Sequence, residues 1–178
     1  MGTKILSEVR NILKIAAFFI VAASLMGCFK EPNFSMSPEI SFADIDKNVV
    51  LDIFTGATKD SLIISINFQD GDGDLGLTEQ EKADAQANND FNYLVKPLRK
   101  TNGTFQYFTP AEPLSGYFPS LKSETKPGAI EGVLSYGVDF FHAFTPKYDT
   151  LKFEIQIKDR AGNMSNIIET DEIVLNEF

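Results

Sequence analysis

Two stretches of alternating hydrophobicity most constrain how this 178-residue chain can fold. In residues 61–69 and 150–158, every second side chain is apolar, and the side chains between them are mostly polar. Successive side chains of a strand point to opposite faces of a sheet, so this pattern predicts two half-buried β-strands. The apolar positions are Leu62, Ile64, Ile66 and Phe68 in the first stretch, and Leu151, Phe153, Ile155 and Ile157 in the second.

Weaker strand patterns recur along the rest of the chain, separated by turn residues. One helical segment interrupts them at residues 78–87, where Thr78 and Glu81 have the spacing of a capping box. A segment rich in Pro, Gly, Ser and Lys, residues 109–128, is expected to run over the surface. We therefore predict an all-β fold, an antiparallel sandwich of about seven to nine strands. The further strands are expected at residues 38–42, 49–54, 91–98, 105–108, 129–141 and 166–175.

Composition excludes some functions and leaves others open. The net charge of −9 argues against nucleic acid as a partner, because phosphate binding needs clustered Lys and Arg. The single histidine, His142, lies among aromatic residues with no visible catalytic partner, and no nucleophile motif occurs. These features predict a non-enzymatic protein. A hydrolase that uses a carboxylate pair stays possible, because Asp and Glu are plentiful.

The N-terminus has the features of a targeting segment. A basic region is followed by an uncharged, mostly apolar run, residues 15–26, which is too short to cross a bilayer comfortably. The run ends in Leu25-Met-Gly-Cys28, which resembles the lipobox of bacterial lipoproteins. That resemblance implies a helical signal peptide over residues 1–27 and palmitate or a similar acyl chain on Cys28. Residues 28–37 would then be a tether, and residues 38–178 the sandwich domain.

Two alternatives concern this N-terminal segment. It could be an uncleaved anchor, or an ordinary secretory signal followed by a chance cysteine. Lys30-Glu31 resembles the surface-export signal of Bacteroidota lipoproteins, but it is also compatible with a plain polar linker. The expected location is therefore the outer membrane of a bacterial envelope, with the domain in the periplasm or on the cell surface.

The stretch Asp70-Gly-Asp-Gly-Asp-Leu-Gly76 follows the first alternating strand and places three carboxylates at alternate positions. Ca²⁺ takes six to eight oxygen ligands, and glycines let a backbone curl around the ion. Numbered as an EF-hand loop, the aspartates fall on positions one, three and five, and Glu81 on position twelve. However, Leu75 occupies the glycine position, and a strand precedes the loop instead of a helix. The alternative is a set of solvated Asx-turns at the end of a strand.

The turn Asp159-Arg-Ala-Gly-Asn163 is similar to the last hairpin of bacterial immunoglobulin-like domains. Together with the Asp-Gly stretch, it resembles a group of Bacteroidota envelope lipoproteins that carry such a domain. This resemblance implies an immunoglobulin-like sandwich in which the loops after residues 61–69 and 150–158 lie at one end. The implied composite Ca²⁺ site uses Asp70, Asp72, Asp74 and Asp159, with Glu81 and Asn163 as possible additional ligands.

Taken together, these features predict a lipid-anchored envelope protein whose Ca²⁺-stabilised domain binds a protein or a glycan. A structural subunit of an envelope complex is the remaining alternative. Several aromatic residues between positions 105 and 118, such as Tyr107 and Tyr117, indicate either a surface for stacking against a sugar or peptide, or ordinary packing. The absence of Trp weakens the case for sugar stacking.

Overall fold

The computed structural model describes residues 32–122 and 128–177. These described residues form one compact unit. The predicted signal peptide and the lipidation site at Cys28 lie outside the described residues. In the part of the chain that the structure describes, no helix has both the length and the apolar character needed to cross a membrane.

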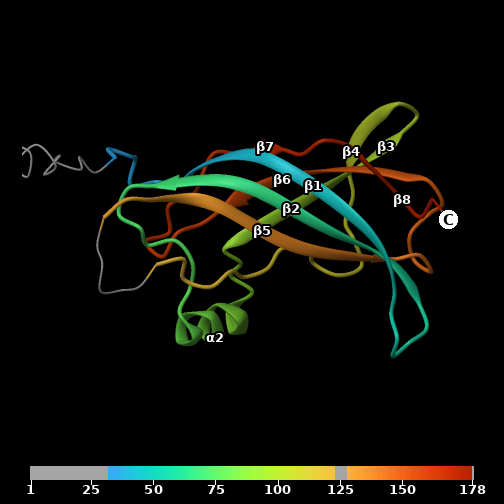
Figure 1. Ribbon diagram of the computed structural model, residues 1–178, viewed down its shortest axis with the longest axis horizontal. Helices are drawn as coiled ribbons and strands as arrows, with labels where there is room; N and C mark the ends of the chain where they lie inside the picture. The colour runs from blue at the N-terminus through green and yellow to red at the C-terminus, as the bar shows by residue number, and fades with distance from the viewer. Residues whose placement is uncertain (1–31, 123–127, 178) are drawn as a thin grey trace, which may run out of the picture. The chain divides into compact units, whose positions relative to one another are not determined.

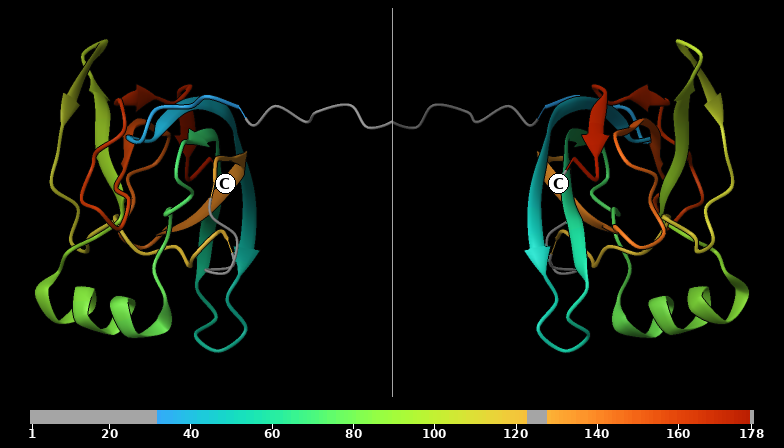
Figure 2. Two further views of the ribbon diagram at one scale, coloured as in Figure 1. Left: turned by 90° about the vertical axis from the view of Figure 1, so that its left-hand side faces the viewer. Right: turned by 90° about the vertical axis from the view of Figure 1, so that its right-hand side faces the viewer.

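Two antiparallel sheets face each other, which confirms the predicted β-sandwich (Figure 1, Figure 2). The first sheet has the strand order β1-β2-β5, and the second has the order β4-β3-β6, with β7 and β8 paired to the far edge of β6. This order corresponds to strands A-B-E facing C′-C-F-G of an immunoglobulin-like sandwich. The strands are β1 (Glu39–Leu51), β2 (Thr58–Asp70), β3 (Tyr93–Thr101), β4 (Thr104–Tyr107), β5 (Ile130–Phe141), β6 (Asp149–Ile157), β7 (Ile168–Glu169) and β8 (Ile173–Leu175).

The core lies between the two sheets and is built mainly from the two alternating strands. The inward side chains of β2 and β6 are almost completely buried, as the alternation predicts. Burying one such side chain contributes about 1.5–3 kcal/mol to the free energy of unfolding. Tyr93 of β3 stacks on Tyr136 of β5 with ring centroids 4.2 Å apart, which links the second sheet to the first.

The predicted separation of residues 38–42 from residues 49–54 is wrong. Residues 39–42 and 49–51 belong to one strand, β1, which stays paired with β2 along its length. A bulge between Phe42 and Asp44 shifts the register, and this breaks the alternation that the sequence pattern would otherwise show. Ile53 and Phe54 are not in a strand but in the exposed turn that follows β1.

Two further expectations need correction. The last predicted strand, residues 166–175, is divided into β7, which pairs with Glu154 and Ile155 of β6, and β8, which pairs with residues 149–151 at its start. The segment after β4 is only partly a surface excursion, since Phe118 is 3% exposed and belongs to the core. Phe118 and Ser120 form backbone hydrogen bonds with Leu77, which fastens the segment to the loop after β2.

The single described helix, α2 (Glu79–Asn88), confirms the predicted helical segment. Thr78 is its N-cap: the Thr78 hydroxyl accepts a hydrogen bond from Glu81 N, and the Glu81 carboxylate accepts one from Thr78 N at 2.8 Å. This is the reciprocal capping box that the spacing predicts. None of the residues of α2 is buried. The helix is a polar excursion on the connection from β2 to β3 and lies outside the two sheets (Figure 2).

Candidate metal centre

Asp70 ends β2 and is completely buried. Its Oδ2 accepts hydrogen bonds from the backbone N–H groups of Gly73 at 2.8 Å and Asp74 at 3.1 Å. These bonds curl the chain back on itself directly after the strand. The other oxygen, Oδ1, is also buried but has no hydrogen-bond partner among the described residues. A buried carboxylate oxygen without a hydrogen-bond partner lowers the stability of the native state, so a ligand bound to this atom would be stabilising.

Asp74 joins this loop to the turn that follows β6. Its Oδ2 accepts a hydrogen bond from Ala161 N at 3.0 Å, and its backbone carbonyl accepts one from Arg160 Nε at 3.1 Å. Asp74 Oδ1, like Asp70 Oδ1, is buried and has no hydrogen-bond partner among the described residues. The loop of one sheet is therefore held against the turn of the other.

Asp159 supplies the third carboxylate and lies two residues after the end of β6. It is 3% exposed, and Asn163 orients it: Asn163 N donates to Oδ1 at 2.7 Å, and Asn163 Nδ2 donates to Oδ2 at 2.8 Å. Each oxygen has a second lone pair that can still bind a cation. Asn163 thus acts on the site through Asp159.

One oxygen from each of Asp70, Asp74 and Asp159 lies within 4.8 Å of the other two. Ca²⁺–oxygen distances are about 2.3–2.6 Å, so two ligands on opposite sides of one ion are about 4.6–5.2 Å apart. The three carboxylates therefore fit around a single divalent cation. The two loops meet at one end of the sandwich, as the sequence predicts.

The other predicted ligands lie differently. Asp72 is exposed at the tip of the loop and is not part of the three-carboxylate cluster. Glu81 uses its carboxylate in the capping box of α2. The structure thus brings together three of the four predicted ligands and gives Glu81 and Asn163 supporting contacts instead.

Burial and neighbouring carboxylates raise the pKa of two residues of the site, Asp70 and Asp74. Burial, and next the charge of Asp72, raise the pKa of Asp70 to about 6, although two backbone N–H groups act against the shift. Burial, and next the charges of Asp159 and Asp72, also raise the pKa of Asp74, and Arg160 offsets this only in part. Without a cation, the native state therefore holds these charges at a cost.

The raised pKa of Asp70 predicts an unusual pH dependence for the metal-free protein. Between the unfolded pKa of about 4 and the native pKa of about 6, the native state binds more protons than the unfolded state. The free energy of unfolding should therefore increase as the pH falls from 7.5 to 5, by about 1 kcal/mol. Chemical denaturation in chelator at both pH values measures this. Asp70→Asn should remove the increase, and an unchanged increase in that variant would assign it to another group.

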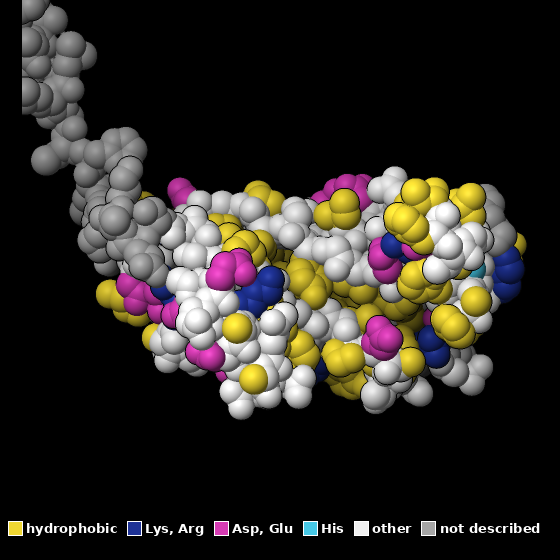
Figure 3. All heavy atoms as spheres, turned by 90° about the horizontal axis from the view of Figure 1, so that it is seen from below, with side chains coloured by type: hydrophobic (Ala, Val, Ile, Leu, Met, Phe, Trp, Pro, Cys, Tyr) yellow, Lys and Arg dark blue, Asp and Glu magenta, His cyan; other side chains and the backbone are white. Residues whose placement is uncertain are grey.

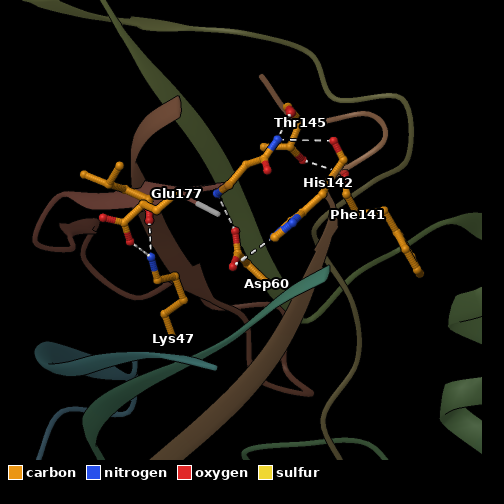
Figure 4. A network of polar contacts seen from close by, with 8 residues as sticks. Lys47, Asp60, Phe141, His142, Thr145 and Glu177 are labelled. Atoms are coloured by element: carbon orange, nitrogen blue, oxygen red, sulfur yellow. Dashed lines mark hydrogen bonds and ion pairs between the residues drawn. The ribbon is translucent and has the colours of Figure 1, made fainter. Parts of the chain in front are cut away.

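A second buried polar cluster lies at the opposite end of β2 (Figure 4). Asp60 is completely buried, its Oδ2 accepts a hydrogen bond from Asn176 N at 2.7 Å, and its Oδ1 lies 3.2 Å from His142 Nε2. The Asn176 side chain donates to the carbonyl of Thr145 at 2.6 Å. The sequence pattern does not indicate this cluster, because Asp60 and Asn176 are 116 residues apart in the chain.

This cluster fastens the C-terminal segment to the sandwich, so its loss should destabilise the fold. We expect Asp60→Ala to lower the free energy of unfolding by about 2 kcal/mol, because it leaves the buried N–H of Asn176 without a partner. Urea denaturation measures this. Glu172→Ala, which removes the exposed ion pair with Lys100, is the control and should change stability by less than about 0.5 kcal/mol. Equal effects of the two variants would contradict a fastening role.

Comparison of the chain with models of known protein families, with curated proteins and with solved structures gave no match.

Proposed function

We propose that this chain is a lipid-anchored protein of the bacterial cell envelope, with a non-enzymatic, protein- or glycan-binding sandwich domain whose anchor-side end is locked by Ca²⁺. Two observations together support the cation site. Asp70 Oδ1 and Asp74 Oδ1 are buried without a hydrogen-bond partner among the described residues. One carboxylate oxygen of each of these residues lies within 4.8 Å of an oxygen of Asp159. A solvated acidic turn would leave such oxygens in water. Here they are shielded from it, and a bound cation would satisfy all three carboxylates at once.

The donor set favours Ca²⁺ over Mg²⁺. All three side-chain ligands are carboxylates on irregular loops. The remaining coordination positions of the ion would be filled by water. Ca²⁺ accepts six to eight oxygens in flexible geometry, whereas Mg²⁺ demands near-ideal octahedral geometry and is reluctant to lose its water. The hydrogen bonds from Asn163 and Ala161 hold the carboxylates in place, which is the supporting role of groups around a metal's direct ligands.

The cation would act by cross-linking the two sheets. Asp70 and Asp74 belong to the loop after β2, and Asp159 belongs to the turn after β6 in the other sheet. A ligand that binds only the native state stabilises that state by mass action. A loop and a turn that otherwise meet through a few hydrogen bonds of Asp74 would then become a rigid end of the domain.

This end of the sandwich is also where the tether enters. Gly71 N donates a hydrogen bond to Ser35 O at 2.8 Å, and a Cβ atom on Gly71 would lie 2.6 Å from Phe34 O. Ser35 lies seven positions after Cys28, so an extended chain reaches at most about 25 Å between them. An acyl chain on Cys28 would therefore keep the metal centre close to the bilayer.

The non-enzymatic part of the proposal is supported by the role of the one histidine. His142 contacts buried Asp60 in a cluster that fastens the C-terminal segment. A structural contact of this kind explains the histidine without any reaction.

Isothermal titration calorimetry of the full-length protein in detergent tests the cation. We expect one Ca²⁺ per chain, a much weaker response to Mg²⁺, and no Ca²⁺ heat in Asp74→Asn, which keeps the side chain's size. Absence of Ca²⁺ heat in the native protein, or equal heat in Asp74→Asn, would contradict the proposed site.

Metabolic labelling with a clickable palmitate analogue tests the anchor. The native protein should carry the label and fractionate with membranes, and Cys28→Ala should lose both properties. An unlabelled native protein would refute lipidation but would leave the cation site untouched.

A further inference from the structure

β5 is an edge strand with an open side. It pairs with β2 and with no other strand among the described residues. His142 N donates to Thr58 O at 2.9 Å, in continuation of the β2–β5 register. Residues of an antiparallel pair alternate between those that exchange hydrogen bonds with the partner and those that face away from it. The even-numbered residues of β5 therefore bond to β2, and Ser135, Gly137 and Asp139 present N–H and C=O groups to the outer edge.

These three edge residues are exposed, and no backbone hydrogen bond joins them to another described segment. Unpaired edges of this kind are templates for pairing with another chain. The open edge of β5 is therefore a place where a further strand can be added.

A groove of about 860 Å³ runs along this edge. Residues 136–141 of β5 form one wall, and residues 108–114, which follow β4, form the other. Figure 3 looks onto this side of the domain, where hydrophobic side chains gather in a hollow. Six residues of β5 span about 20 Å, the length of an extended segment of about six residues.

The far wall of the groove is held in place. Arg99 binds the buried carboxylate of Asp149 through Nη2 at 2.8 Å and Nε at 3.0 Å. The same guanidinium lies 4.1 Å from the centroid of the Phe108 ring and covers one face of it. The groove is thus shaped before any partner arrives, which lowers the entropic cost of binding.

Three of the five aromatic residues that line the groove already have a ring or a cation against one face, and Phe144, which is 88% exposed, is the one left open to solvent. Tyr136 is stacked on Tyr93, Phe108 is covered by Arg99, and the ammonium of Lys59 lies 5.6 Å from the centroid of Phe141. What the groove offers is apolar surface together with free backbone groups. An extended polypeptide uses both, because its backbone fills the edge and alternate side chains enter the groove.

Charge indicates the kind of polypeptide. Among the residues that the structure describes, Arg99 is the only Lys or Arg that lines the groove, and Asp149 neutralises it. Glu112 and Asp139 also line the groove, but Asp139 is paired with Lys59 Nζ at 2.6 Å, so Glu112 supplies the uncompensated charge, in a chain whose net charge is −9. A segment with apolar side chains at alternate positions and Lys or Arg between them complements this surface.

We propose that this groove binds an extended, basic-apolar polypeptide segment, which adds as a strand to the free edge of β5. The wall formed by residues 108–114 stands beside the edge, so the site suits a single strand better than the edge of a second rigid sandwich. The inference rests on the binding role proposed above and names its partner class. It does not depend on the cation, because Asp70 lies opposite Ile130, at the far end of β5 from the groove.

Selection from a phage-displayed library of random twelve-residue peptides on the full-length protein in detergent tests the inference. The selected peptides should alternate apolar residues with polar or basic ones. The strongest binder, made as a synthetic peptide, should bind equally well in Ca²⁺ and in chelator. Failure of the cation site would therefore leave this result unchanged. A selection without enrichment above an unrelated protein would overturn the inference.

Two substitutions at Gly137 distinguish binding through the backbone edge of β5 from binding through side chains of the groove. Gly137→Pro removes an outward N–H and places the ring at the edge without breaking a hydrogen bond to β2, so peptide affinity should fall at least about tenfold. Gly137→Ala is the matched control: its Cβ would lie 4.0 Å from the nearest heavy atom, Leu62 O, and affinity should not change. Equal affinity of the two variants would overturn strand addition.

A test on the peptide keeps the inference falsifiable even if Gly137→Pro fails to fold. Methylation of single backbone amides should weaken binding at every second position only, because alternate amides face β5. Uniform effects along the peptide would contradict the inference. So would a glycan on an array that competes with the peptide, or a dimer in sedimentation analysis that the peptide dissociates, since these assign the groove to a sugar or to a second copy.

Discussion

Calcium at a hundredfold excess over its Kd should stabilise the native protein by about 2.7 kcal/mol relative to chelator. For a domain of this size, that corresponds to a rise in melting temperature of about 5–10 °C. The reason is that the cation replaces an unfavourable native state, in which Asp70 and Asp74 carry buried, unpartnered oxygens and raised pKa values. Differential scanning calorimetry of the full-length protein measures the shift.

Variants with the same change in charge show where the effect arises. Asp74→Asn and Asp159→Asn should each remove the Ca²⁺-dependent rise. Asp84→Asn, on the exposed face of α2, should keep it. In chelator, Asp70→Asn should be at least as stable as the native protein at pH 7.5, because it removes a charge that costs about 3 kcal/mol there. A Ca²⁺ shift that survives in Asp74→Asn and Asp159→Asn would contradict the account.

Replacement of Gly76 by Ala should lower the free energy of unfolding by about 3–4 kcal/mol. Gly76 has φ +86°, a conformation that costs an L-residue about 1–2 kcal/mol. In addition, a Cβ atom there would lie 2.0 Å from Pro119 O, so the backbone must move. That movement would break the hydrogen bonds between Leu77 and the buried segment around Phe118.

Gly103→Ala is the control for Gly76→Ala. Gly103 has a similar φ of +80° in the β3–β4 turn, but nothing lies within 4 Å of a Cβ atom there. It should lose only the conformational term, about 1 kcal/mol. Urea denaturation of both variants gives the difference. If the two losses are equal, the close approach of residues 118–120 to the loop after β2 is not as we describe it.

The elements that the sequence predicted well are those with a single buried face. β2 and β6 alternate without interruption, so burial on one side is visible in the order of residues. The helix was predictable from Thr78 and Glu81, because a capping box is a local interaction. The immunoglobulin-like order of strands then implied that the loops after β2 and β6 share one end.

Elements that depend on distant contacts were not predictable. The bulge after Phe42 hides the continuity of β1, and β7 has only two residues, too few to form a pattern. The exposure of Asp72 follows from the curl that Asp70 imposes by accepting two backbone hydrogen bonds. In the sequence, all three aspartates of the loop look equivalent, and only the fold separates the buried pair from the one at the tip.

The glycines of the Asp-Gly stretch have structural reasons of their own. Gly71 is required by the close approach of the tether, and Gly76 by the close approach of Pro119. The carboxylates are different, because no packing contact explains why Asp70 and Asp74 each bury an oxygen without a partner. The cation accounts for the acidic residues and the packing accounts for the glycines, so the two explanations apply to different residues of the same loop.

The most direct test of the central claim is an anomalous difference map from crystals of the protein grown with Ca²⁺. The account predicts one peak at the end of the sandwich where the loops after β2 and β6 meet, about 2.3–2.6 Å from a carboxylate oxygen of each of Asp70, Asp74 and Asp159. A map without a peak between these three carboxylates, at a Ca²⁺ concentration that saturates the calorimetric signal, would contradict it.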